Sequence, residues 1–244
     1  MSARQGHDRV VCGQQTIAYD ITYSRRRTVG ITVLPAGEVH VAAPLRMSAA
    51  QVRRLVVEKA GWIERKLGQF RADGCHDVTK RYLDGEQFLY LGEEYRLRLL
   101  AGEHGPLVTL GAGRLNAILP PGADGRQAEM ARKVVYDWYK FHAGMAIDRA
   151  IGKYSGRLGI WEPDYKLKNL SRRWGSCTTD NRLSFNVKIV MAPLPQLEYV
   201  VAHELCHVKV KDHSPRFWAL LESVMPGYKE SKKALKRDGW KYEL

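Results

Sequence analysis

The chain has 244 residues, 45% of them hydrophobic, and its 39 Lys and Arg against 26 Asp and Glu give a formal net charge of +13. This composition allows one large core or two modest ones, and the charge favours anionic partners without selecting among them. The first residues lack the apolar run of a signal peptide, and no later run approaches the roughly 20 apolar residues of a membrane span. The four cysteines form no CxxC pair, which suits neither a disulfide framework nor a zinc ribbon. We therefore expect a cytoplasmic protein with reduced thiols and no membrane partner.

The first half predicts strands interrupted by one helix. Alternating apolar residues at 29–33 and 39–41, separated by Pro35-Ala36-Gly37, predict a hairpin. A capping box at Ser48 and Gln51 begins a helical pattern over about 48–70. The segments QFLYLGEEYRLRLL and PLVTLGAGRLNAIL each predict two short strands around a glycine-containing turn. Together these elements indicate a mostly antiparallel sheet module.

The strand pattern ends in a run of Pro, Gly, Ala and Asp at 120–125, where we predict a domain boundary. The predicted division is an N-terminal β-rich module with one helix at 1–120 and a C-terminal module at 126–244. The second module opens with a helical pattern over about 126–150 and continues with strand-like pieces near 165–169 and 183–190.

The last conspicuous helical pattern begins near Pro195 and contains His203-Glu204-Leu205-Cys206-His207, an HExxH motif. Residues four apart on a helix lie about 40° apart around the axis, so both imidazoles can reach one ion. Glu204 lies on the flank of the same face, the position of the general base in HExxH metalloproteases. Cys206 points about 100° away from its neighbour His207, so we expect a small buried residue there and not a ligand.

A third ligand completes a catalytic zinc site of the usual kind, and His213 is the first choice. Ser214-Pro215 predicts a helix start directly after it, so the intervening turn can bring His213 back towards the ion. Asp212 and Glu222 are its rivals as third ligand. The alternative is a purely structural histidine cluster, because an HExxH string arises by chance in on the order of one to two chains per hundred of this composition.

A second segment, Arg172-Arg173-Trp174-Gly175-Ser176, is a candidate substrate-binding element. Its arginines and backbone donors can hold an anionic or carbonyl group beside a metal. A solvated turn with a packed tryptophan explains the same residues equally well.

Several stretches in order along the chain carry a family resemblance: SRRRTVGITV, KAGWIERKL, YLGEEYRLRL, RRWGSC, LSFNVKIVMAP and YVVAHELCHVKVKDHSPRFW. From about residue 17 to 236 the chain resembles the YgjP-like metallopeptidase family, relatives of SprT-type and minigluzincin-like zincins. The resemblance implies a zinc-bound HExxH helix with His203, His207 and His213 as ligands, Glu204 as the catalytic residue, and the segment from Arg173 to Cys177 as a strand-edge motif beside the cleft.

We therefore predict an α+β protein whose C-terminal module is zincin-like, and a zinc-dependent hydrolase with one Zn ion per chain. A metallopeptidase acting on peptides comes first. Metal-dependent hydrolysis of nucleotides or other phosphorylated substrates is the alternative, because the net charge and the Arg172-Arg173 pair suit phosphate. A third hypothesis is a DNA-associated protease-like protein whose basic run at 229–241 contacts nucleic acid, although acidic residues interrupt that run and a solvated helix face is favoured.

Overall fold

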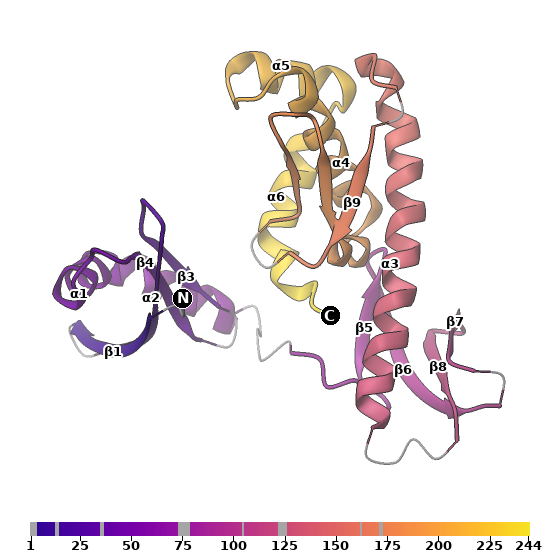
Figure 1. Cartoon of the computed structure of the whole chain (residues 1–244), viewed down its shortest axis with the longest axis horizontal. Helices are drawn as coiled ribbons and strands as arrows, with labels where there is room; N and C mark the ends of the chain where they lie inside the picture. The colour runs from indigo at the N-terminus through magenta and orange to yellow at the C-terminus, as the bar shows by residue number, and fades with distance from the viewer. Residues whose placement is uncertain are drawn as a thin grey trace. The chain divides into compact units, whose positions relative to one another are not determined.

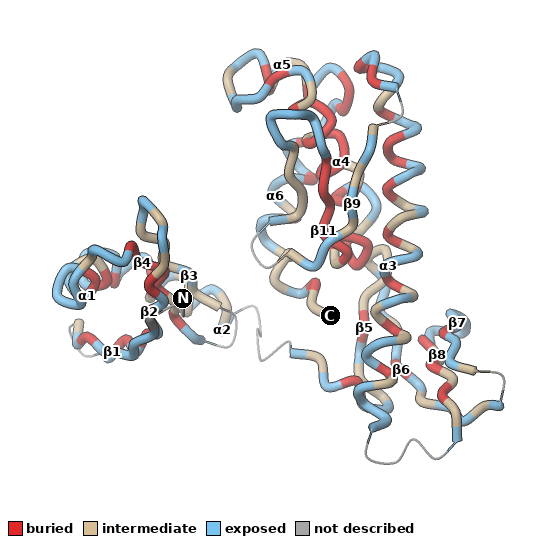
Figure 2. Tube along the Cα trace, in the orientation of Figure 1, coloured by how far each residue is buried: buried red, intermediate tan, exposed pale blue. Residues whose placement is uncertain are grey.

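The computed structural model describes residues 4–12, 15–34, 37–72, 79–103, 105–121, 126–161, 163–170 and 173–244 (Figure 1). They form two compact units, Met1–Val78 and Thr79–Leu244. Each unit has its own cluster of buried hydrophobic residues, shown in red in Figure 2. In the described part of the chain, no helix has the length and apolar character needed to cross a membrane.

The N-terminal unit is a four-stranded sheet covered by two helices. Its strands β1 (Arg4–Cys12), β2 (Gln15–Ser24), β3 (Gly30–Val33) and β4 (Val39–Pro44) lie in the order β1-β2-β4-β3. The predicted hairpin is confirmed, with β3 antiparallel to β4; its turn at residues 35 and 36 lies outside the described residues. We did not predict β1 and β2, although every second residue of β2 from Ile17 to Tyr23 is buried, the period-2 pattern of a half-buried strand.

The helical segment of this unit begins where the capping box predicts. Ser48 is the N-cap of α1 (Ala49–Glu58), and its side chain accepts a hydrogen bond from the Gln51 backbone N–H. The single helix predicted over 48–70 is wrong, because α1 ends at Glu58 and a second helix, α2 (Ala60–Ala72), follows. The chain leaves the helical region at Lys59, with φ −99° and ψ 3°, and the neighbouring Gly61 weakens helical continuity there.

The second sheet has the same strand order as the first. Strands β5 (Gln87–Tyr90), β6 (Glu93–Ala101), β7 (Leu107–Gly111) and β8 (Arg114–Leu119) are arranged β5-β6-β8-β7. Both predicted hairpins are present. In each of the two sheets, however, the two hairpins are joined by a parallel central pair, β2 with β4 and β6 with β8. Parallel pairing joins distant segments, which hairpin signals in the sequence do not encode.

This second sheet belongs to the C-terminal unit, so the compact units divide near residue 78 and not in the predicted interval between 120 and 126. The backbone N–H groups of Leu91 and Gly92 donate to the carbonyls of Val190 and Met191, at 2.8 and 3.0 Å. The hydroxyl of Tyr139 donates to the Leu89 carbonyl at 2.7 Å. These bonds and a shared hydrophobic cluster join the sheet to the elements that follow it.

The rest of the C-terminal unit is built around one long helix, α3 (Gln127–Tyr154), which extends past the predicted end at 150. It is followed by the 3-10 helix η1 (Gly156–Leu158) and by β9 (Tyr165–Lys168), β10 (Gly175–Cys177) and β11 (Leu183–Asn186), arranged β10-β11-β9 with β10 at the edge. The strand predicted over 183–190 ends at Asn186 and becomes the 3-10 helix η2 (Val187–Met191). A short, mostly buried run of this kind suits either structure, and here the Asn186 side chain caps η2 by accepting from the Lys188 N–H.

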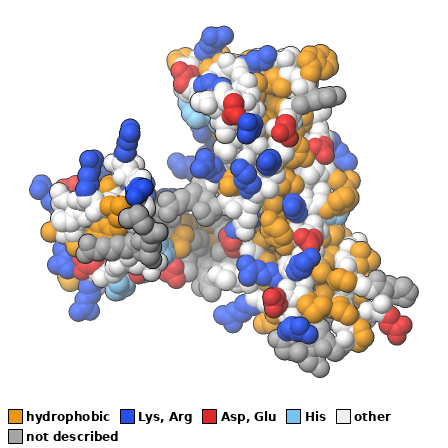
Figure 3. All heavy atoms as spheres, in the orientation of Figure 1, with side chains coloured by type: hydrophobic (Ala, Val, Ile, Leu, Met, Phe, Trp, Pro, Cys, Tyr) orange, Lys and Arg blue, Asp and Glu red, His pale blue; other side chains and the backbone are white. Residues whose placement is uncertain are grey.

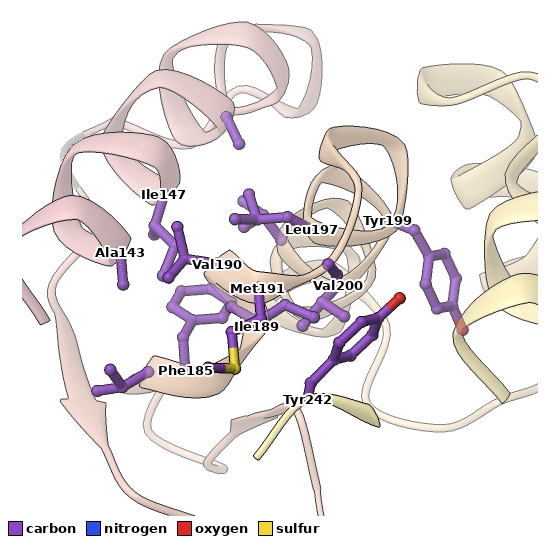
Figure 4. Packing of buried hydrophobic residues seen from close by; sticks show 14 of the residues in the cluster. Ala143, Ile147, Phe185, Ile189, Val190, Met191, Leu197, Tyr199, Val200 and Tyr242 are labelled. Atoms are coloured by element: carbon purple, nitrogen blue, oxygen red, sulfur yellow. The ribbon is translucent and has the colours of Figure 1, made fainter. Parts of the chain in front are cut away.

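The chain closes with α4 (Leu194–Lys209), α5 (Pro215–Val224), α6 (Tyr228–Asp238) and the short η3 (Gly239–Lys241). Figure 4 shows how α4 enters the core: Leu197 and Val200 lie in one buried cluster with Ile147 of α3, Phe185 of β11 and Val190 of η2. The predicted α+β class is confirmed, with two four-stranded sheets in the N-terminal half, and with a three-stranded sheet and the helix that carries the HExxH sequence in the C-terminal half.

Candidate metal centre

The HExxH sequence occupies the last two turns of α4, a helix whose other face is core. Leu197, Val201 and Leu205 are fully buried, which fixes the rotation of the helix about its axis. This rotation leaves His203 half-buried on the open side and His207 with 9% of its surface exposed. Cys206 is completely buried, as expected for a small apolar residue beside the site.

Three imidazole nitrogens converge at this end of α4. The Nε2 atom of His207 lies 3.2 Å from that of His203 and 3.1 Å from that of His213, and the remaining pair is separated by 3.1 Å. Among the described residues, these three histidines form the group of His, Cys, Asp and Glu side chains placed to hold a metal ion. The three histidines that the sequence predicted as metal ligands therefore lie next to one another in the structure.

The nitrogen triangle fits a zinc ion. Zinc binds histidine nitrogen at about 2.0–2.1 Å in tetrahedral sites, which places two ligand nitrogens about 3.3–3.4 Å apart. The observed separations of 3.1–3.2 Å are close to this value. The donor set of three imidazoles is also one that catalytic zinc sites use.

Each histidine ring is held by specific neighbours. Nδ1 of His207 lies 3.0 Å from the Val210 carbonyl, which sets the tautomer with the proton on Nδ1 and the lone pair on Nε2. The His203 Nδ1 atom is buried and has no hydrogen-bond partner among the described residues. Phe217, fully buried on α5, packs against all three imidazoles, with ring centroids 4.4–4.9 Å away.

Burial keeps two of these imidazoles neutral, the form that binds a metal. It lowers the pKa of His203 to about 3, and the nearby positive forms of His207 and His213 act in the same direction. The pKa of His207 is also lowered, again chiefly by burial.

Glu204 follows His203 directly on α4 and is buried, with 6% of its surface exposed. Burial raises the pKa of its carboxyl to about 7, and the positive charge of Arg173 opposes that rise. A β-carbon added to Gly175 would lie 2.6 Å from Glu204 Cγ and 2.7 Å from its Oε1, so the absence of a side chain on β10 makes room for this carboxylate. The carboxyl therefore titrates near neutral pH in a site that excludes most of the solvent.

His213 is placed by the turn between α4 and α5. Ser214 is the N-cap of α5 and Pro215 its first residue, as predicted, but the Ser214 side chain makes no capping bond. Asp212 instead accepts a hydrogen bond from the Ser214 N–H at 3.2 Å. The ammonium group of Lys211 donates to the Thr178 carbonyl at 2.8 Å and to Asn181 Oδ1 at 2.5 Å, which joins the turn to the loop after β10.

The two rival ligands are engaged elsewhere. The Asp212 carboxylate caps the turn, and the capping bonds to Ser214 hold its pKa below the usual range. Glu222 forms an ion pair with Lys229 at 3.4 Å. Neither belongs to the converging group.

The Arg172–Ser176 segment is only partly beside the site. Arg172 lies outside the described residues. Arg173 is exposed, and its backbone carbonyl accepts from Asn186 Nδ2 at 3.1 Å. Trp174 packs edge-on against Tyr242, while Gly175 contacts Glu204 and Ser176 pairs with Ser184 across the sheet. The segment thus combines a packed tryptophan with one direct contact to the catalytic candidate.

Sequence reasoning missed an aromatic wall next to the triad. Trp218 stacks on His213 at 5.4 Å and on Tyr228 at 5.7 Å, and Tyr228 stacks on Tyr199. The ammonium group of Lys232 lies 3.9 Å from the Trp218 ring centroid. Tyr199, four residues before His203, shares its helix face, a signal present in the sequence; the contributions from α5 and α6 are tertiary.

The basic C-terminal run forms α6 and η3, and several of its charges are paired. Arg237 and Lys241 form ion pairs with Asp238, and Lys229 pairs with Glu222. These partners lower the positive charge that the run presents to a nucleic acid.

Comparison with known proteins places these features in a family. A family model described as YgjP-like, metallopeptidase domain, matches residues 27–238, which include the three histidines, Glu204 and Gly175. The chain matches no curated protein. Among solved structures it is similar to the metallopeptidase zymogen of Pyrococcus abyssi abylysin, with a TM-score of 0.32 and 20% identity over 39% of this chain and 93% of that chain.

Proposed function

The chain belongs to the YgjP-like metallopeptidase family, and we propose that it hydrolyses peptide bonds with one zinc ion per chain held by His203, His207 and His213. One observation carries the ligand assignment: three Nε2 atoms lie 3.1–3.2 Å from one another. The chemistry that zinc supplies in such a site is Lewis acidity, which polarises a carbonyl group and makes water a stronger acid.

Glu204 is the general base in this proposal. It takes a proton from the attacking water and passes it to the leaving amine as the C–N bond breaks. Its position supports the role because burial raises the pKa of the carboxyl to about 7, where the group accepts and returns a proton with little free-energy cost. The adjacent Arg173 charge favours the ionised form that the first transfer requires.

We place the substrate along β10. This strand is at the edge of its sheet, so an extended peptide can pair with its backbone in the manner of an added strand. Gly175 on this strand contacts Glu204, so a peptide bound there brings an amide group close to the proposed base. In the aromatic wall, the half-buried Trp218 supplies apolar surface on the α5–α6 side of the site, and the buried Tyr228 and Tyr199 stack behind it.

Phosphorylated substrates, including nucleotides, are a second candidate class. The observation that favours them is the positive charge of Arg173 close enough to Glu204 to lower its pKa. The same charge serves a peptide carbonyl, and the family membership is what makes us favour peptides.

The test uses zinc-loaded full-length chain with casein and with a nucleoside triphosphate as separate substrates. We expect cleavage of casein and no release of phosphate or pyrophosphate. Glu204→Gln is expected to retain zinc while its turnover falls by about 10²–10⁴-fold. Phosphate release that depends on Glu204, with casein left intact, would replace the peptidase assignment by the nucleotide alternative.

A further inference from the structure

A second charged site lies in the N-terminal unit, at one end of its sheet. Strands β2 and β4 are parallel and in register, with Ser24 opposite Pro44, so their carboxyl ends lie side by side. The ladder continues one step further, because the Leu45 N–H donates to the Ser24 carbonyl at 3.1 Å. Arg25, Arg26 and Arg27 directly follow the end of β2, and Leu45 and Arg46 directly follow the end of β4. Basic residues about twenty positions apart in the sequence are therefore close together at this end of the sheet.

These two segments line an open pocket of about 320 Å³. Its lining residues are Ser24, Arg25, Arg26, Arg27, Pro44, Leu45 and Arg46. Four of the seven are arginines and none is acidic. Basic side chains project around this unit in Figure 3, but here four of them share one concave surface.

Three of the four arginines, Arg26, Arg27 and Arg46, have no carboxylate partner among the described residues. The Arg26 Nε atom is buried and lacks a hydrogen-bond partner there. Its guanidinium lies over Gly30 of β3, where an added β-carbon would come within 3.2 Å of Nη2. A buried guanidinium donor without an acceptor is costly unless a ligand supplies one.

The chemistry of the lining selects a class of ligand. Guanidinium groups match the oxygens of phosphate in bidentate pairs, and they keep their charge at every physiological pH. The volume exceeds what one phosphate fills, and the exposed Leu45, with 52% of its surface accessible, offers apolar contact at the rim. We propose that this pocket binds phosphate groups of a nucleotide or of a nucleic-acid strand, at a site separate from the histidine triad.

The test compares two triple variants of the full-length, metal-free chain. Arg26→Gln/Arg27→Gln/Arg46→Gln removes three charges from the pocket. Arg54→Gln/Arg65→Gln/Arg71→Gln removes three charges from exposed positions on α1 and α2 of the same unit. Binding of inorganic pyrophosphate, measured by titration calorimetry, is expected to weaken at least tenfold in the pocket variant and less than threefold in its matched control.

Two further titrations distinguish a nucleotide from a nucleic-acid strand as the ligand that carries the phosphate. ATP and a fluorescein-labelled 12-nucleotide single strand are titrated in parallel, and the probe whose affinity depends more on the pocket arginines identifies the source. For a strand, the affinity must also fall with added salt, more steeply in the parent than in the pocket variant.

The proposal is overturned if both triple variants lose the same affinity, if pyrophosphate does not bind the parent chain, or if citrate binds the pocket as tightly as pyrophosphate. Should the pocket variant fail to fold, as judged by its circular dichroism melt, the single variants Arg27→Gln and Arg46→Gln replace it. Both side chains are exposed, and each is expected to weaken pyrophosphate binding more than Arg54→Gln does.

Discussion

Gly175 on β10 and Glu204 on α4 are in such close contact that any β-carbon at position 175 would overlap the carboxylate, with 2.6 Å to Glu204 Cγ and 2.9 Å to Cδ. Both atoms belong to the side chain that we propose as the general base, and only 6% of the surface of Glu204 is exposed. The absence of a side chain at Gly175 therefore lets the edge strand and the catalytic helix approach closely at Glu204.

Gly175→Ala is expected to lower turnover by about 10²-fold while zinc remains bound, because a displaced base no longer reaches its proton and the three histidines are untouched. Steady-state kinetics and metal content of the same sample measure the two effects. Gly152→Ala on α3 is the matched control, since a β-carbon there meets nothing within 4 Å. Equal turnover in Gly175→Ala and the parent would show that the position of Glu204 does not limit the reaction.

Single alanine substitutions at His213, Asp212 and Glu222 identify the third ligand. We expect His213→Ala to weaken zinc binding by several orders of magnitude, because one of three nitrogens is lost. Asp212→Ala is expected to cost about 10–100-fold, since it only loosens the turn that carries His213. Zinc affinity is measured by competition with a chromogenic chelator. A parent-like affinity in His213→Ala, together with a large loss in Glu222→Ala, would overturn the proposed ligand set.

Lys211 is expected to position His213. Its ammonium group bonds to the Thr178 carbonyl and Asn181, which holds the α4–α5 turn against the loop after β10. Lys211→Met should therefore reduce zinc affinity about 10–100-fold, the usual effect of losing a group that orients a ligand. Lys233→Met, which removes an exposed charge on α6, serves as the control. Partial recovery of zinc affinity in Lys211→Arg, which keeps a positive charge able to bond to the same loop, would distinguish this positioning role from a general effect on stability.

Burial of Glu204 predicts a specific dependence of stability on pH in the metal-free protein. The folded state raises the pKa of this carboxyl from 4.5 to about 7, so between these values the folded state binds more protons than the unfolded state. This carboxyl's contribution to the free energy of unfolding must then fall as pH rises from about 4.5 to 7, by up to about 3 kcal/mol, and level off above that range.

Glu204→Gln removes this titration and leaves the others in place. The difference in free energy of unfolding between the two metal-free proteins, measured by urea denaturation at several pH values, isolates the carboxyl. Taking this difference between the two proteins is necessary because His203 has the opposite effect: its lowered pKa makes the folded state more stable as pH rises. A difference that does not vary with pH would mean that Glu204 is not desolvated.

The parts of the site that follow from local periodicity could be predicted from the sequence. His203 and His207 share a helix face because they are four residues apart, and Ser214-Pro215 indicated the helix start that places His213. The contact between Gly175 and Glu204 could not be predicted, since it joins a strand and a helix whose approach depends on packing. The same holds for Phe217, which touches all three imidazoles from another helix.

In the fold, too, local elements could be predicted from the sequence but the pairing of distant segments could not. Hairpins were predictable from alternation and turns, whereas the parallel pairing of β2 with β4 and of β6 with β8 was not. The boundary predicted between 120 and 126 follows a real change from strands to helix. It does not separate compact units, because Leu91 and Gly92 bond to the chain at 190–191 and attach the second sheet to the C-terminal core.

The central claim, that three histidines hold one zinc ion, is tested most directly by the metal content of protein purified without chelators. Elemental analysis is predicted to give about one zinc per chain for the parent and none for His203→Ala/His207→Ala/His213→Ala. Parent protein without any transition metal, or a triple variant that retains the same zinc content, would contradict it.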